Sequence, residues 1–148
     1  MRLTMHTDYA LRVLMFLALE PDEVHAIPAM AQRYGISRNH LMKVGLTLIQ
    51  NGFVESVRGR NGGLKLAKSP HEIKLSEIVR ATEDNFAIVE CFDRGNNNCL
   101  VTPACGLRVP LQDALSAFMA VLDRYTLADA IQPSGRANRM RRLLNAVG

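Results

Sequence analysis

The three cysteines of the chain, Cys91, Cys99 and Cys105, lie close together in the segment CFDRGNNNCLVTPAC. The residues between them are polar, rich in Gly and Asn and interrupted by Pro103, so we expect a loop. Three thiols on one loop are typical of a shared ligand, because deprotonated cysteine binds zinc, copper(I) and iron–sulfur clusters. This segment is therefore the first candidate for a metal centre.

The spacing of the cysteines indicates what kind of centre this could be. Structural zinc is usually held by close Cys-x2–4-Cys pairs, whereas the spacing here is Cys-x7-Cys-x5-Cys, with no histidine in the segment. Wide gaps favour a larger object such as an iron–sulfur cluster. Three thiolates leave a four-iron cluster one ligand short, so another side chain binds the fourth iron or that iron is open. Redox-active thiols, zinc and an incidental grouping stay open as alternatives.

The residues before the cysteines predict a DNA-binding fold. Apolar residues at i, i+3 and i+4 predict an amphipathic helix over 3–19. Two further helices are expected over 28–34 and 38–50. The turn between them, residues 34–37 with the sequence YGIS, is short and contains glycine, which is typical of a helix-turn-helix.

A short hairpin is expected directly after these helices. Alternating apolar and polar residues predict strands over 53–57 and 64–67, joined by the basic, glycine-rich sequence RGRNGG. A helix-turn-helix followed by a hairpin is the order of a winged helix. The glycine-rich turn is not a P-loop, because it lacks the lysine signature and leads into a strand rather than a helix.

Polar and basic residues of these elements are candidates for DNA contacts. The first turn of a recognition helix meets base edges in the major groove, where arginine can read guanine and asparagine can read adenine. Arginines on the hairpin can follow phosphates or enter a narrow minor groove. A solvated polar turn would explain the helix alone, but the hairpin favours DNA binding. The candidates are Ser37, Arg38, Asn39, His40, Lys43, Arg58, Arg60, Asn61, Gly62, Gly63 and, as the weakest, Arg2.

The second half of the chain predicts a connection and a long helix. A short helix is expected over 75–82, a long one over 110–125 and the start of another at 126–129. The apolar residues of the long helix recur at spacings of 4, 3, 4 and 3, which favours pairing with a second copy. A helix buried on its own domain would show the same pattern. The recurring residues are Leu111, Leu115, Phe118, Leu122 and Tyr125.

The predicted fold class is mainly α with a small β-hairpin. We divide the chain into a winged helix-turn-helix DNA-binding domain (1–70), a connecting helix with the cysteine loop (71–106), a dimerisation helix (107–132) and a basic C-terminal tail (133–148). Residues 136–142 of this tail are expected to be loosely held.

Composition limits the class of protein. The longest apolar run, residues 13–19, is far shorter than the ~20 residues of a membrane span, and the N-terminus lacks a signal-peptide pattern. We therefore expect a cytoplasmic protein with no membrane association. The net charge of +4 permits a nucleic-acid partner without establishing one. No Ser/His/Asp or paired-carboxylate arrangement stands out, so we expect no enzyme, and a small thiol redox protein is the alternative from another class.

Several segments together resemble the Rrf-two family of winged-helix regulators over about residues 1–132. They are MRLTMHTDYALRVLMFLAL, YGISRNHLMKV, VESVRGRNGGLKLA, the loop words ECF and NNNCLVTPACGL, and AFMAVLDRYTLADAI. The resemblance implies a homodimeric repressor that binds a palindromic operator on double-stranded DNA. It also implies one iron–sulfur cluster per subunit, 4Fe–4S in preference to 2Fe–2S.

By motif match, the resemblance implies that Cys91, Cys99 and Cys105 bind the cluster and that Asp8 of the partner subunit is the fourth ligand. Helical geometry agrees, because at about 100° per residue Asp8 lies opposite the apolar face of the first helix. The chain is similar to the branch that senses nitric oxide, in which nitrosylation of the cluster releases the operator. The cysteine spacing also resembles an iron-responsive rhizobial branch, which has asparagine where this chain has Asp8.

Overall fold

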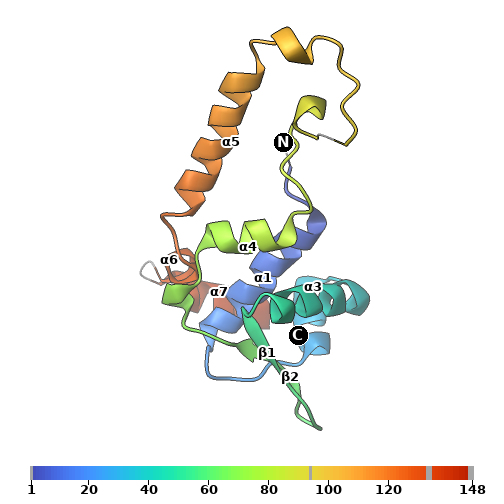
Figure 1. Cartoon of the computed structure of the whole chain (residues 1–148). Helices are drawn as coiled ribbons and strands as arrows, with labels where there is room; N and C mark the ends of the chain where they lie inside the picture. The colour runs from blue at the N-terminus through green and yellow to red at the C-terminus, as the bar shows by residue number, and fades with distance from the viewer. Residues whose placement is uncertain (1, 94, 133–134, 147–148) are drawn as a thin grey trace.

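Helix α1 (Met5–Leu19) lies at the centre of the winged-helix half of the protein (Figure 1). The structure, a computed structural model, describes residues 2–93, 95–132 and 135–146. Thr4 caps α1, because its hydroxyl oxygen accepts a hydrogen bond of 3.2 Å from the backbone N–H of Thr7. The apolar face predicted for this helix is buried, with Leu14 and Leu17 almost fully excluded from solvent.

The predicted winged helix is confirmed. It consists of α2 (Ile27–Tyr34), α3 (Arg38–Gln50) and the antiparallel strands β1 (Val54–Val57) and β2 (Gly63–Leu66), each within one residue of its predicted limits. Gly35 adopts a φ of 62° in the turn between α2 and α3, a conformation that favours glycine. Ser37 then caps α3 by accepting a hydrogen bond of 3.2 Å from the backbone N–H of His40.

Two close approaches fix the hairpin relative to α3. His25 and Leu64 form a pair of backbone hydrogen bonds of 2.9 Å, which attach β2 to the segment before α2. A Cβ atom on Gly63 would lie 2.2 Å from the carbonyl oxygen of His25, so only glycine permits this pairing. A Cβ atom on Gly45 would lie 3.2 Å from the Leu64 side chain, so α3 and β2 also pack closely.

The cysteines and the long helix lie apart from this core. After η1 (Pro70–Glu72) and α4 (Leu75–Thr82) the chain runs through η2 (Glu90–Phe92) and η3 (Thr102–Ala104) into α5 (Arg108–Leu122). Figure 1 shows α5 rising away from α1, with the cysteine-bearing chain arched over its start. We call residues 85–122 the arm. Among its described residues, only Met119 is buried.

The long helix ends before its predicted limit at residue 125. Backbone hydrogen bonds join Leu75 to Tyr125 at 2.9 Å and Leu127 to Ile73 at 2.8 Å, so the chain there pairs with the start of α4. Helix α5 therefore ends at Leu122, before this pairing begins. Thr126 caps the next helix, α6 (Leu127–Ile131), which packs on α1 and η1.

The expectation of a loosely held basic tail is wrong for the described end of the chain. Residues Arg136–Asn145 form helix α7, which contacts α2 and buries Leu144. Ala137 and Met140 also pack against the core, and the guanidinium of Arg141 donates a hydrogen bond to the carbonyl oxygen of Leu19. The apolar positions follow helical spacing, but the arginines between them hide the pattern. No helix in the described part of the chain is long and apolar enough to cross a bilayer.

Candidate metal centre and nucleic-acid interface

The three cysteines lie along one irregular stretch of the arm, as the sequence predicts. Cys91 belongs to η2, Cys105 directly follows η3, and Cys99 lies between these two short turns. All three side chains are free and half-buried. They are therefore partly accessible to a ligand.

A hydrogen bond fastens the first cysteine segment to the second. The backbone N–H of Asn98, which precedes Cys99, donates to the carboxylate of Glu90, which precedes Cys91, at 2.6 Å. A hydrogen bond to a carboxylate is stronger than one between neutral groups. Glu90 therefore limits how far these two thiols can separate.

A second group of hydrogen bonds fastens the middle segment to the third. The side-chain oxygen of Asn97 accepts from the backbone N–H of Cys99 at 3.1 Å, and its amide nitrogen donates to the hydroxyl of Thr102 at 3.1 Å. Thr102 begins the turn that leads to Cys105. Glu90, Asn97 and Thr102 were not among the predicted site residues, although the run of three asparagines was an available signal for Asn97.

Asp93 organises the turn after Cys91. Its carboxylate accepts hydrogen bonds from the Asn96 side chain at 2.8 Å and from the backbone N–H of Gly95 at 3.0 Å. These donors, the Asn96 amide first, lower the pKa of Asp93 below its ordinary value. The Asp93 carboxylate therefore holds together the start of the turn that follows Cys91.

The donor set fits an iron–sulfur cluster better than a single zinc ion. Zinc–sulfur bonds of about 2.3 Å in a tetrahedron would hold the sulfur atoms about 3.8 Å apart. Among the described residues, the three thiols do not form a group whose ligand atoms all lie within 4.8 Å of one another. In a cluster the thiolates bind different irons, so wider separation is expected.

Asp8 is paired within its own helix. Its carboxylate contacts the guanidinium of Arg12 at 2.7 Å, and the Arg12 Nε donates a second bond of 3.2 Å. Both side chains are about two-fifths exposed, at 41% and 44%. Within the described part of one chain, Asp8 and the three thiols are not brought together as a group of ligand atoms within 4.8 Å.

The N-terminal half of α1 contacts α3 at two places. The Arg12 guanidinium lies 5.9 Å from the centre of the Tyr9 ring, and that ring lies 6.0 Å from the ring of His40. The side chains of His6 and Thr47 are hydrogen-bonded at 3.1 Å. A displacement of α1 near Asp8 would therefore also displace the part of α3 that it contacts.

Tyr34 ties α2 to the same part of α1. Its hydroxyl donates to the carbonyl oxygen of Arg12 at 3.1 Å. Burial raises the pKa of Tyr34 to about 12, although the positive charge of Arg12 acts in the opposite direction. The hydroxyl thus remains a donor across the physiological pH range.

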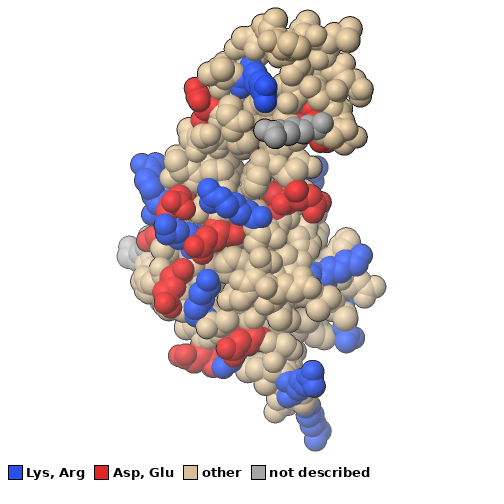
Figure 2. All heavy atoms as spheres, viewed as in Figure 1, with Lys and Arg blue, Asp and Glu red and all other residues tan. Residues whose placement is uncertain are grey.

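The predicted DNA-binding residues of α3 and the hairpin share one region of the surface. A hollow of about 350 Å³ between the two elements is lined by Arg38, Gly62 and Gly63. Figure 2 shows Lys and Arg side chains at the end of the hairpin and beside α3, whereas both signs of charge mix over the middle of the molecule. The exposed candidates are Ser37, Arg38, Asn39, His40, Lys43, Arg58, Arg60 and Asn61.

Arg2 is not brought together with the other DNA-binding candidates. It lines a separate hollow of about 620 Å³, bounded by residues 83–89 and by α5. Leu111, Leu115 and Phe118 of the predicted dimerisation seam line the same hollow. These three apolar side chains are half-buried in the single chain.

Comparison with known proteins places these features in a family. The Rrf2 family, described as "Iron-dependent Transcriptional regulator", matches residues 3–133. The HTH-type transcriptional regulator NsrR of Bacillus subtilis is 53% identical over 133 residues, covering 89% of this chain and 91% of that protein. NsrR of Bacillus licheniformis is 49% identical over 146 residues, covering 98% and 100%. The structure of CymR, the global cysteine regulator of Bacillus subtilis, has a TM-score of 0.67 at 25% identity, covering 88% and 95%.

Proposed function

Because the chain belongs to the Rrf2 family of transcriptional regulators, we propose that it is a homodimeric repressor that senses nitric oxide through an iron–sulfur cluster. The observation that carries the proposal is the set of three half-buried thiols fastened along one stretch of the arm. Relatives named NsrR, at 46–53% identity, support a repressor of this kind.

Cys91, Cys99 and Cys105 would hold the cluster, with 4Fe–4S favoured over 2Fe–2S, as the family resemblance implies. Either cluster takes four ligands, so three thiolates leave one position for a different side chain. When bound, the cluster supplies irons that react with nitric oxide. Asp8 of the partner subunit is the proposed fourth ligand. A carboxylate is a harder ligand than a thiolate, so Asp8 is the ligand that iron would release most readily. An Asp8 carboxylate that does not bind iron would form the ion pair with Arg12 of its own helix.

The surface of α5 supports the homodimer. This helix has fifteen residues, and Met119 is the one buried residue among them. Most helical stability in proteins comes from packing of an apolar face, so α5 requires a further surface against its half-buried seam. A second copy of the chain would supply that surface. The two copies would then present two α3 helices to a palindromic operator, about one turn of DNA apart.

A series of contacts from the end of α4 through α1 to α3 supports a route for the signal. Residues 85–89 connect the cysteines to the end of α4. Glu83, which directly follows α4, accepts hydrogen bonds through its carboxylate from the backbone N–H and the hydroxyl of Thr4, at 2.8 and 3.1 Å. Thr4 caps α1, whose His6 and Tyr9 contact α3. A change in the arm would therefore reach α3 through the start of α1. The coupling needs only a few kcal/mol of difference between two arrangements.

Anaerobic spectroscopy combined with operator binding tests the proposal. The protein, prepared with iron and sulfide, should be brown with broad visible absorption, bind its operator, and release it as nitric oxide is added. Asp8→Ala should alter the cluster's reactivity or its coupling to DNA. A colourless anaerobic protein that binds its operator tightly would contradict the sensor function.

An iron-responsive regulator is the second candidate, and the family's description as iron-dependent favours it. The same preparation separates the two functions. Release of the operator by an iron chelator, with no response to nitric oxide, would support iron sensing. Turnover of a thiol or disulfide substrate with no operator binding would instead support a thiol redox protein.

A further inference from the structure

Two large apolar side chains lie exposed on the outer surface of α3. Met42 is 46% exposed and Leu46 is 59% exposed, whereas Leu41, Val44 and Leu48 of the same helix are buried. Only polar and basic residues of this helix were predicted to contact DNA. Exposed apolar groups that occur together on a binding surface indicate contact with a partner.

Helical geometry places this apolar pair among the proposed DNA contacts. At about 100° per residue, Leu46 points within about 20° of the direction of Asn39, and Met42 within about 60° of it. The buried Leu48 lies about 180° from Asn39. Lys43 lies on the same outer face, about 60° from Leu46. Met42 and Leu46 are therefore continuous with the polar surface that would enter the major groove.

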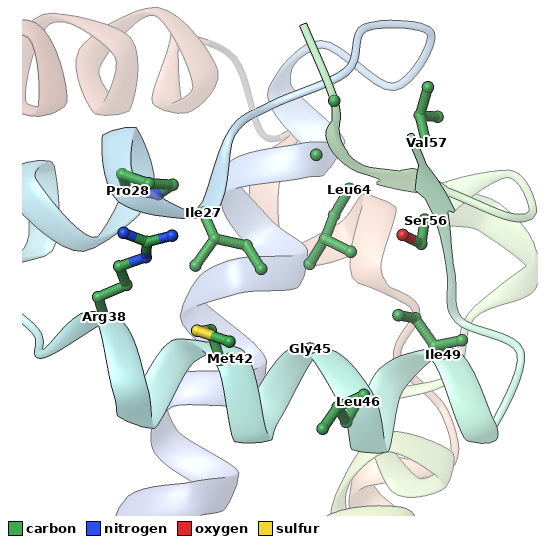
Figure 3. A pocket seen from close by; sticks show the side chains of 12 residues that line it. Ile27, Pro28, Arg38, Met42, Gly45, Leu46, Ile49, Ser56, Val57 and Leu64 are labelled. Atoms are coloured by element: carbon green, nitrogen blue, oxygen red, sulfur yellow. The ribbon is translucent and has the colours of Figure 1, made fainter. Parts of the chain in front are cut away.

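The surroundings of the pair favour nucleic acid over an apolar protein surface. Met42, Leu46 and Arg38 line the hollow between α3 and the hairpin, which Figure 3 shows from close by. Arg38 and Lys43 flank the pair with positive charge, and an apolar protein partner would leave that charge unmatched. The phosphates that border the major groove match it, and the groove floor offers one apolar group, the methyl of thymine.

We propose that Met42 and Leu46 contact thymine methyl groups in the operator. This inference rests on the proposed DNA binding and names the bases that α3 selects. The two residues are about 6 Å apart along the helix axis, close to two base-pair steps of about 3.4 Å. They therefore select thymines about two base pairs apart in each half-site.

Replacing thymidine with deoxyuridine tests the contribution of the methyl group alone, because deoxyuridine lacks that methyl group and is otherwise identical. A duplex is selected from a randomised pool by the full-length, anaerobically purified protein, and each thymine is replaced singly. We expect about fourfold weaker binding at each contacted thymine, equivalent to about 0.8 kcal/mol for one buried methyl group. Met42→Ala should remove the effect at one position and Leu46→Ala at the other.

Leu143→Ala provides the matched control, because Leu143 is 62% exposed on α7 and belongs to neither α3 nor the hairpin. This variant should retain the full response to uridine. Both α3 variants should unfold like the wild type, since alanine is a good helix former and the replaced side chains are exposed.

Three outcomes would overturn the inference. If the duplex is bound selectively but uridine has no effect, or the same effect on wild type and both variants, the methyl contacts are absent while DNA binding stands. A second outcome is that the wild-type protein self-associates, that Met42→Ala and Leu46→Ala abolish this association, and that uridine has no effect. In that case a second copy of the chain covers the pair, and DNA does not. If no duplex is bound selectively, the proposed DNA binding fails together with the inference.

Discussion

The winged-helix half and the arm differ in what holds them together. In the winged-helix half, α1, α3 and the hairpin share one apolar core that includes Leu14, Leu48 and Leu64. In the described part of the arm, only Met119 is buried, and the segments around the cysteines are joined by polar side chains such as Asn97.

This difference would separate folding from the proposed sensing. Burial of apolar surface is the dominant favourable contribution to folding, so we expect the winged-helix half to fold without the cysteines. The described part of the arm lacks such a core, and the proposed second copy and thiol ligand would supply the contacts that it is missing. A signal that acts on the arm can therefore change DNA binding without unfolding the half that binds DNA.

The largest expected effect comes from removing one thiol. Cys99→Ser should abolish retention of the cluster and the response to nitric oxide, while the thermal unfolding of the winged-helix half stays unchanged. Iron and sulfide content, visible absorption and circular dichroism measure these quantities. Ala104→Ser, which adds a hydroxyl beside Cys105 and removes no thiol, should behave like the wild type. Loss of the fold in Cys99→Ser would show that the two halves are not separable.

A substitution in the core should lower the stability of the fold and leave cluster uptake unchanged. Leu14 is fully buried in α1, so Leu14→Ala should lower the free energy of unfolding by about 2–5 kcal/mol. Urea unfolding measures the change. The three thiols should still take up a cluster under conditions where the protein remains folded. A loss of cluster uptake in the folded variant would contradict the comparison between core and arm.

A charge in the seam of α5 should break the dimer and leave the core intact. Phe118 is half-buried beside Leu115, and Phe118→Asp should give a folded monomer that binds the operator about 100-fold more weakly, because avidity between half-sites is lost. Sedimentation and operator titration measure this. Ser116→Asp places the same charge at an already exposed polar position and should remain dimeric. A dimeric Phe118→Asp protein would exclude this seam as the interface.

Removing a polar contact of the arm should affect the cluster more than stability. Asn97→Ala deletes the contacts to Cys99 and Thr102, yet the free energy of unfolding should fall by no more than about 1 kcal/mol, because the groups are exposed. Loss of the cluster to a chelator should become faster. Asn145→Ala on α7 is the control and should change neither quantity. An unchanged rate of cluster loss in Asn97→Ala would show that these contacts do not help to hold the cluster.

The smallest effect concerns the junction between α4 and α5. The hydroxyl of Ser76 donates to the carboxylate of Asp123 at 2.6 Å, and Lys74 lies 3.7 Å from it. These contacts, Ser76 first, hold the pKa of Asp123 below its ordinary value of 3.8. Their contribution to stability is complete above pH 3.8 and is lost as the pH falls through the lowered pKa.

Ser76→Ala should therefore raise the pKa of Asp123 toward 3.8 and remove most of this dependence on pH. Titration of the carboxyl carbons by NMR measures it. The pKa of Asp129, lowered mainly by Thr126, should not change and provides an internal control. An unchanged pKa of Asp123 in Ser76→Ala would show that the hydrogen bond does not hold this junction.

Local patterns of the sequence determined most of the helices and the hairpin. Helical spacing in α1, the cap at Ser37 and the glycines around the hairpin act through residues a few positions apart, so they can be recognised without knowledge of packing. The loop nature of the cysteine segment followed from its polar composition in the same way. The grouping of its thiols as cluster ligands stays a prediction from their spacing and from the family resemblance.

Contacts between distant residues were decided only by the tertiary structure. It attached α7 to the core, where arginines had hidden an apolar face, and it put Arg2 beside α5 rather than beside α3. It also joined Glu83 to Thr4. Such contacts depend on how the elements pack against one another, and spacing within a single element carries no information about that packing.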